Sequence, residues 1–156
     1  MLRGLSASEI AELRAGTGMG LARAAELNGY PGPRHVLDAV EAGQLQASAE
    51  QVQHVRQIFD GMKRDALRVA ARIIEEEEHL EAAFRSATIT EPVLRSRMAQ
   101  LATLHGELRA IHLRAHLAAR ALLSDAQVAR YDELRGYTMG QAGPHPPEPL
   151  GASHRH

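Results

Sequence analysis

The chain carries two long stretches in which apolar residues recur every three or four positions. The first runs from Ser48 to Phe84 with Gly61 as its one glycine and no proline, a pattern that predicts a long amphipathic helix. Its apolar seam consists of Val52, Val55, Phe59, Met62, Ala66, Val69, Ile73 and Leu80. The second stretch begins at Thr90, a helix-capping residue, with Pro92 in its first turn. Its seam consists of Leu94, Leu101, Leu104, Leu108, Ile111, Ala115, Ala118 and Leu122.

The link between the two stretches, Ser86–Ile89, is short, so the two predicted helices should fold back as a long antiparallel hairpin. Each apolar seam is narrow, and two helices alone cannot bury both seams. We therefore expect the short helices of the chain to wrap the hairpin, and the hairpin to form a homodimer. The predicted fold class is all-α.

Residues 1–47 are predicted to form short helices separated by turns. Ser6 and Glu9 form a capping box that opens the first helix, and the glycine-rich run 16–20 ends it. Because this run follows a helix rather than a strand, it does not fit a phosphate-binding loop. The expected helices cover about 8–15, 21–27 and 34–41.

Two further capping boxes, Ser48 with Gln51 and Ser124 with Gln127, open the hairpin and a last helix that ends near Tyr137. The hairpin and this C-terminal helix together make a domain over residues 48–138. The remaining residues, 139–156, are rich in proline and glycine and predict a disordered tail.

Composition removes several classes of function. The formal net charge of −1 argues against a nucleic-acid-binding protein that works by bulk electrostatics. The chain has no cysteine, which excludes disulfides and thiolate metal sites.

Serines lie at helix starts, where capping explains them, and no catalytic constellation is present, so we do not expect an enzyme. The first thirty residues hold no continuous apolar segment, which predicts either a cytoplasmic protein or one whose leader has been removed.

Three histidines, His105, His112 and His116, lie on one stripe of the second long helix. At about 100° per residue they fall within roughly 40° of one another, and Met98 falls in the same arc. His112 and His116 can bind one metal ion from adjacent turns, since neutral imidazole is a common ligand of Zn, Ni and Cu. The alternative is that these histidines merely flank the apolar seam as half-buried side chains.

Two histidines do not complete a metal site, so further ligands must come from elsewhere. With the turn of the hairpin near residue 88, His112 and His116 face positions near 63 and 59, which brings Met62 and Asp65 near them. A second subunit adds His54, which lies toward that end of the hairpin. The candidate metal ligands are therefore His112, His116, His105, Met62 and His54.

An acidic run, Glu75–Glu78, lies on the first long helix. Consecutive carboxylates point all round a helix and do not converge on one ion, so we expect them to pair with Arg95 and Arg97 across the hairpin. Glu76 falls on the apolar seam, where a carboxylate needs a partner.

The stretch Leu123–Leu134, which reads LSDAQVARYDEL, resembles the Leu-Thr-x-x-Gln motif of the Spy/CpxP-type periplasmic proteins. A partner copy stands at Ser48-Ala49-Glu50-Gln51, before the first long helix. The order of short helices, long helical hairpin and Ser/Thr-x-x-Gln helix is similar to that of this family and of its relatives, the periplasmic heavy-metal-resistance and sensor proteins. The resemblance covers about residues 45–137.

The resemblance implies a cradle-shaped all-α homodimer in the periplasm. Family members either bind metals such as nickel, cobalt, zinc or copper and report them, or shield unfolded proteins without ATP. In the sensors the ligands include histidines spaced four apart on helices, as His112 and His116 are. The first arm departs from that pattern, because His54 has Ile58 four residues later.

These observations predict a heavy-metal-binding resistance or sensor protein that holds Zn, Ni or Cu and reports to a membrane signalling partner. The alternative is an ATP-independent holdase for unfolded-protein clients, for which exposed arginines would form basic rims: Arg56, Arg64, Arg68 and Arg72. A third interpretation, a cytoplasmic coiled-coil adaptor, applies if the native gene encodes no leader.

Overall fold

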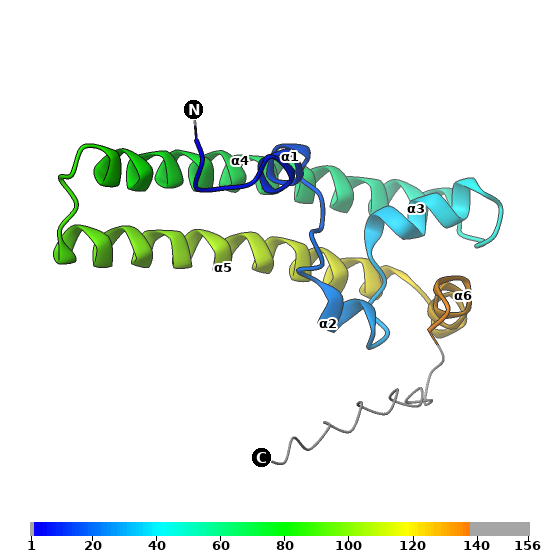
Figure 1. Ribbon diagram of the computed structural model, residues 1–156. Helices are drawn as coiled ribbons and strands as arrows, with labels where there is room; N and C mark the ends of the chain where they lie inside the picture. The colour runs from blue at the N-terminus through cyan, green and yellow to red at the C-terminus, as the bar shows by residue number, and fades with distance from the viewer. Residues whose placement is uncertain (1, 138–156) are drawn as a thin grey trace, which may run out of the picture.

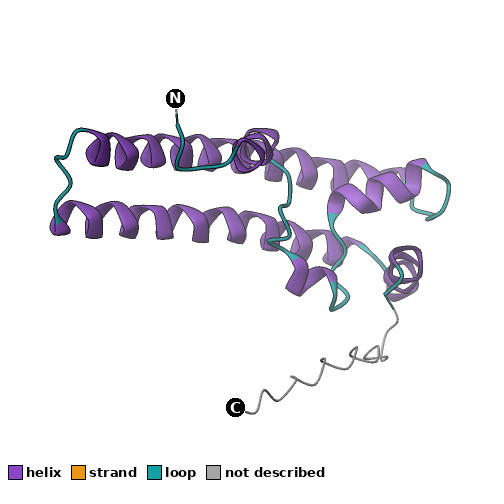
Figure 2. Cartoon of the chain, viewed as in Figure 1, coloured by secondary structure: helices purple, strands orange, loops and turns teal. Residues whose placement is uncertain are grey.

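The computed structural model describes residues 2–137, which fold into six α-helices joined by short loops, with no β-strand among them (Figure 2). The all-α prediction is therefore confirmed for this part of the chain, whereas the predicted disordered tail, 139–156, lies outside it. The helices are α1 (Ala7–Ala15), α2 (Arg23–Glu26), α3 (Pro33–Glu41), α4 (Ala49–Arg85), α5 (Glu91–Leu122) and α6 (Asp125–Arg135). None of the helices in residues 2–137 combines the length and apolar character that crossing a bilayer requires.

The two longest helices, α4 and α5, lie side by side and run in opposite directions, joined by the loop 86–90 (Figure 1). Ser48 and Gln51 form the predicted capping box at the start of α4. Thr90 caps α5 by accepting a hydrogen bond from the backbone of Val93. The short helix α1 crosses α4 and is seen end-on, α2 packs against α5, α3 packs against α4 and α5, and α6 lies beyond the end of α5 (Figure 1).

Two clusters of buried apolar side chains hold the helices together. The first joins α1, α4 and α5 and consists of Leu13, Ala66, Val69, Ala70, Ile73, Ile74, Leu101, Leu104 and Leu108. The second joins α3, α4 and α6 and consists of Val36, Ala39, Leu45, Val55, Leu123, Val128 and Tyr131. Removal of these side chains from water is the main favourable contribution to folding. The segment of α5 between the two clusters carries His112 and His116.

The last turns of α5 depart from the predicted seam. Ala118 is exposed, and Ala119 is buried in its place. The buried positions therefore step by four residues from Ala115 rather than by three. Both α2 and α3 pack against α5, and these added contacts decide which side of its last turns is covered.

The short helices differ from their predicted bounds for local reasons. The helix α2 is shorter than the predicted 21–27, because Met19 (φ 51°) and Gly20 (φ 72°) take up left-handed backbone conformations just before it. The helix α6 ends at Arg135 rather than near Tyr137, because Gly136 (φ 77°) forms a left-handed C-cap.

The acidic run on α4 is partly paired as predicted. The Glu76 carboxylate lies on the seam and pairs with Arg97 of α5, at 2.9 Å between Oε2 and Nη1. The prediction for Arg95 was wrong. Its guanidinium pairs with Glu91, one turn earlier on the same helix, at 3.1 Å between Nη2 and Oε1, because a carboxylate four residues away is within reach without crossing to α4.

Candidate functional site

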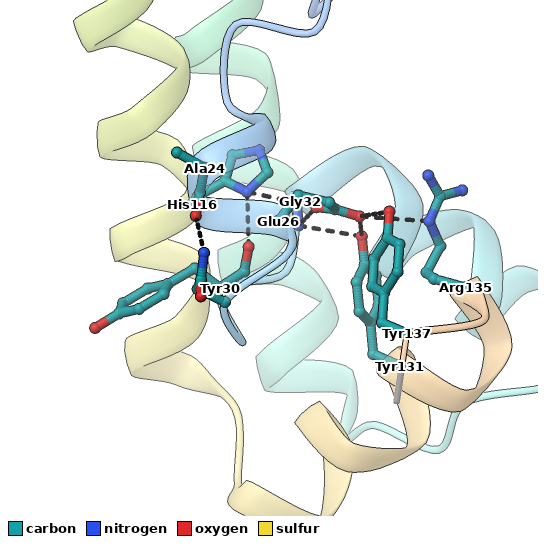
Figure 3. A network of polar contacts seen from close by, with 9 residues as sticks. Ala24, Glu26, Tyr30, Gly32, His116, Tyr131, Arg135 and Tyr137 are labelled. Atoms are coloured by element: carbon teal, nitrogen blue, oxygen red, sulfur yellow. Dashed lines mark hydrogen bonds and ion pairs between the residues drawn. The ribbon is translucent and has the colours of Figure 1, made fainter. Parts of the chain in front are cut away.

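A buried carboxylate on the shortest helix organises the polar interior of the protein. Glu26 of α2 is 8% exposed, and its Oε1 atom accepts a hydrogen bond from the hydroxyl of Tyr131. The hydroxyl of Tyr137 and the Nε of Arg135 each lie 3.4 Å from the same oxygen (Figure 3). Burial, and then the charge of Glu26, raises the pKa of nearby Asp132. One oxygen of Glu26 thus connects α2 to α6 and to Tyr137, two residues beyond the end of α6.

The second oxygen of Glu26 faces α5. Its Oε2 atom accepts a hydrogen bond from the backbone N–H of Gly32 at 3.2 Å and lies 3.6 Å from Nδ1 of His116. The same Nδ1 is 2.7 Å from the carbonyl oxygen of Tyr30 (Figure 3). Because a carbonyl oxygen only accepts, Nδ1 of His116 carries the proton and Nε2 is the ring nitrogen left for another partner.

The turn at Tyr30-Pro31-Gly32-Pro33 brings this backbone to His116. Pro31, Gly32 and Pro33 are all buried. A Cβ atom at Gly32 would lie 3.0 Å from Cε1 of His116 and 3.4 Å from Oε2 of Glu26. A side chain at position 32 would therefore require the imidazole of His116 to move by a few tenths of an ångström.

His112 precedes His116 by one helical turn and is 2% exposed. Its Nε2 atom is buried and has no hydrogen-bond partner within residues 2–137, whereas buried polar atoms are almost always paired. Burial lowers the pKa of His112 below its ordinary value of 6.5, and the charge of His116 acts in the same direction. The imidazole is therefore neutral near pH 7, the state in which it coordinates metal ions.

Both histidines line a cavity of about 660 Å³ between the short helices and the long pair. Met62 of α4, a predicted ligand, lines the same cavity. The rim includes the glycine-rich run 16–20, which follows α1 as the sequence indicated. The residues that line the cavity therefore include three imidazoles, since His35 also lies on its wall, and two thioethers, those of Met19 and Met62.

The other predicted ligands do not line this cavity. His105 lies earlier on α5 than His112 and is exposed, and His54 is exposed near the start of α4. Asp65 is not part of the cavity wall, and Met98 is 42% exposed. In residues 2–137 no three histidine, aspartate or glutamate side chains gather as a metal-binding group. The three histidines of the predicted stripe therefore lie in different environments, because the turn before α3 covers His116 but does not reach His105.

Sequence reasoning missed Glu26, Gly32, Tyr131 and Tyr137. The amino-acid composition held one clue to this network. The chain has only three tyrosines, and all three take part in this network, Tyr30 through its carbonyl oxygen and the other two through their hydroxyls. Glu26, the acceptor, stands in the alanine-rich sequence Ala22–Leu27, where a carboxylate next to a rigid turn is a candidate for burial.

Comparison of the chain with protein-family models, with curated proteins and with solved structures found no match. The resemblance to Spy/CpxP-type proteins therefore depends on the two capping motifs and the order of the helices.

Proposed function

We propose that the protein binds a transition metal ion through His112 and His116. The observation that carries the proposal is the buried Nε2 atom of His112, which has no partner within residues 2–137. An unpaired buried polar atom costs about 1–3 kcal/mol, and a metal ion would remove that cost. His116 suits the same role, because the Tyr30 carbonyl and Glu26 hold its Nδ1 side and orient the ring as second ligand shells do in metal sites.

Copper in its cuprous state suits this cavity better than zinc or nickel. The cavity wall offers imidazoles, which bind copper, zinc and nickel alike, together with the thioether of Met62, a soft ligand of the kind that selects Cu(I). The cavity wall also carries arginine and lysine side chains. Their repulsion is smaller for a monovalent ion than for a divalent one, since Coulomb energy scales with the charge.

The test is metal binding by the full-length, metal-free protein. Cu(I) is titrated anaerobically against a chromogenic chelator, and Zn, Ni and Cu(II) are titrated by calorimetry. We expect His112→Leu and His116→Gln each to weaken Cu(I) binding at least about tenfold. Removal of a group that only supports a metal ligand already lowers metal affinity by about that much. The histidines of the C-terminal tail remain in every variant, so their contribution cancels.

The matched control is His79→Ala, which removes an exposed histidine of α4 outside the cavity wall. This variant should bind Cu(I) as the parent protein does. Parent-like Cu(I) affinity in the double variant His112→Leu/His116→Gln, with an unchanged helical circular dichroism spectrum, would eliminate the site.

The proposed biological role is that of a periplasmic resistance or sensor protein, as the resemblance implies. The proposed metal site is linked to α6 through Glu26, whose Oε2 atom lies 3.6 Å from Nδ1 of His116 and whose Oε1 atom accepts a hydrogen bond from Tyr131. A bound metal ion that shifts His116 would therefore also shift α6, where a signalling partner could detect the change. The test is hydrogen exchange in α6 with and without Cu(I), for which the proposal expects a difference.

A holdase is the second candidate, and one surface favours it. Arg56, Arg64, Arg68 and Arg72 are all exposed on α4, and Leu67 beside them is 37% exposed. The test is suppression of the aggregation of a chemically unfolded client by metal-free protein. Suppression that disappears in Arg64→Glu/Arg68→Glu would support this function, and aggregation equal to that of the client alone would exclude it.

We also propose a cradle-like homodimer built on α4 and α5 as an antiparallel hairpin. The support is the exposure of apolar side chains toward the ends of α4 and α5 that the loop 86–90 joins, Phe84 (56% exposed), Val93 (37% exposed) and Met98 (42% exposed), which a partner would cover. Light scattering after size-exclusion chromatography should give twice the chain mass, and Phe84→Glu should return the protein to a monomer.

A further inference from the structure

The cavity beside the buried histidines has a strongly cationic wall. Its cationic side chains come from four different helices: Arg23 of α2, Arg34 of α3, Lys63 of α4 and Arg135 of α6. Glu26 is the one carboxylate among the described residues that line the cavity. That carboxylate already forms an ion pair with Arg135, whose Nε lies 3.4 Å from Oε1 of Glu26.

The charges of the other three cations are only weakly neutralised by carboxylates. Within residues 2–137 neither Arg23 nor Lys63 forms an ion pair. Arg34 lies 4.0 Å from Asp38, between Nε and Oδ2, but both side chains are more than 60% exposed (64% and 61%), and exposed pairs contribute little. Clustered charges of one sign at a concave surface focus a positive potential there.

The size and the remaining wall of the cavity point to an organic ligand. A volume of about 660 Å³ is that of a small-molecule pocket and exceeds what one metal ion fills. Phe59, Met62 and Leu27 give the wall an apolar part. The rim is open at Gly18 and Gly20, where an added Cβ would meet nothing within 4 Å, so a ligand has a route in.

We propose that this cavity binds a small amphipathic organic anion, with its apolar body against Phe59 and Met62 and its charged group between Arg23 and Lys63. Carboxylates and phosphate monoesters share this chemistry, because arginine and lysine donate to both. The inference does not depend on the proposed metal, since the four cations line the cavity whether or not the histidines hold an ion.

The test uses the full-length protein in buffer that contains EDTA, so that no metal takes part. Anilinonaphthalene sulfonate, an amphipathic anion, is titrated by fluorescence and then displaced with octanoate, octyl phosphate or octanol. We expect both anions to displace the dye and octanol to do so at least about tenfold less well, because only the anions gain the charge-assisted contacts. The better of the two anions identifies the class of charged group.

Variants locate the binding. Lys63→Gln and Arg23→Gln should each weaken octanoate or octyl phosphate binding at least about fivefold. The matched control is Arg114→Gln, which removes an exposed cation of α5 outside the cavity wall and should leave affinity within about twofold. Equal affinity for octanol and the anions, or equal losses in all three variants, would overturn the proposal. Because metal is absent throughout, failure here leaves the Cu(I) titration as a separate test of the proposed function.

Discussion

The side-chain amides of Gln51 and Gln127 face each other and exchange two hydrogen bonds. Gln51 Nε2 donates to Gln127 Oε1 at 2.9 Å, and Gln127 Nε2 donates to Gln51 Oε1 at 3.0 Å. Each oxygen also accepts the backbone N–H of its own N-cap residue, Ser48 or Ser124. The two copies of the Ser-x-x-Gln motif therefore bind each other, in addition to capping α4 and α6.

This pairing predicts that the two glutamines stabilise the fold jointly. Gln127→Ala removes a capping partner and both hydrogen bonds to the amide of Gln51, whose Nε2 still donates to the carbonyl oxygen of Leu122. We therefore expect a loss of about 2 kcal/mol in the free energy of unfolding. Urea unfolding measures it. The matched control is Glu9→Ala, which opens the isolated and exposed capping box of α1 and should cost less than about 1 kcal/mol.

Coupling is the sharper form of this prediction. The double variant Gln51→Ala/Gln127→Ala should lose less stability than the two single variants added together, because either substitution already breaks the pair. Additive losses would contradict the reciprocal contact.

The second prediction concerns the hydroxyls that Glu26 accepts. Tyr131→Phe removes a buried donor and leaves one carboxylate oxygen poorly satisfied, so we expect a loss of about 1–3 kcal/mol in unfolding free energy. Tyr137→Phe is the matched control. Its hydroxyl lies 3.4 Å from the same oxygen and is only part-buried, so its removal should cost less than about 1 kcal/mol. Comparable losses in the two variants would show that the Tyr131 contact is not the stronger one.

The third prediction separates close packing from helix propensity. Gly32→Ala places a Cβ 3.0 Å from Cε1 of His116, so the ring must move, and we expect both stability and Cu(I) affinity to fall. Gly106→Ala lies in the interior of α5, where a Cβ meets nothing within 4 Å. That control should stabilise the protein by about 0.5–1 kcal/mol. Parent-like thermal unfolding and metal titration of Gly32→Ala would contradict the close approach.

The fourth prediction is that stability falls as the pH is lowered below about 6.5, the ordinary pKa of His112. Because burial holds the folded-state pKa of His112 below that value, the unfolded chain binds more protons between the two pKa values. The contribution of neutral His112 is therefore complete above 6.5 and is lost as the pH falls through the folded-state pKa. His35 acts in the same direction, since burial and then Arg135 lower its pKa.

His112→Leu isolates the contribution of His112. Leucine of similar size removes the unpaired Nε2 atom, so we expect the variant to be more stable near pH 7 by about 1 kcal/mol. It should also lose less stability than the parent between about pH 7 and pH 5.5. Asp132, whose pKa is raised, titrates with the opposite sign but remains in both proteins, and urea unfolding at each pH gives the difference. An unchanged pH dependence would mean that His112 does not titrate as a buried group.

The amino-acid sequence by itself determined the helices and most of their ends. Capping boxes, the Thr90 cap and the three- and four-residue spacing of apolar side chains act within a few residues, and they predicted α1, α4, α5 and α6 closely. The pairing of Glu76 with Arg97 was also within reach, because the short link 86–89 fixes which positions face each other. The metal-ligand roles of His112 and His116 remain predictions.

Tertiary structure alone decided which residues form the site. His105 and His112 occupy the same stripe of α5, yet one is exposed and the other buried, because packing rather than helical angle determines what covers a side chain. Glu26 meets Tyr131 across 105 positions of sequence, and no local pattern encodes a contact of that range. Helix formation is a property of neighbouring residues, whereas burial, charge compensation and cavity shape depend on where distant segments come to lie.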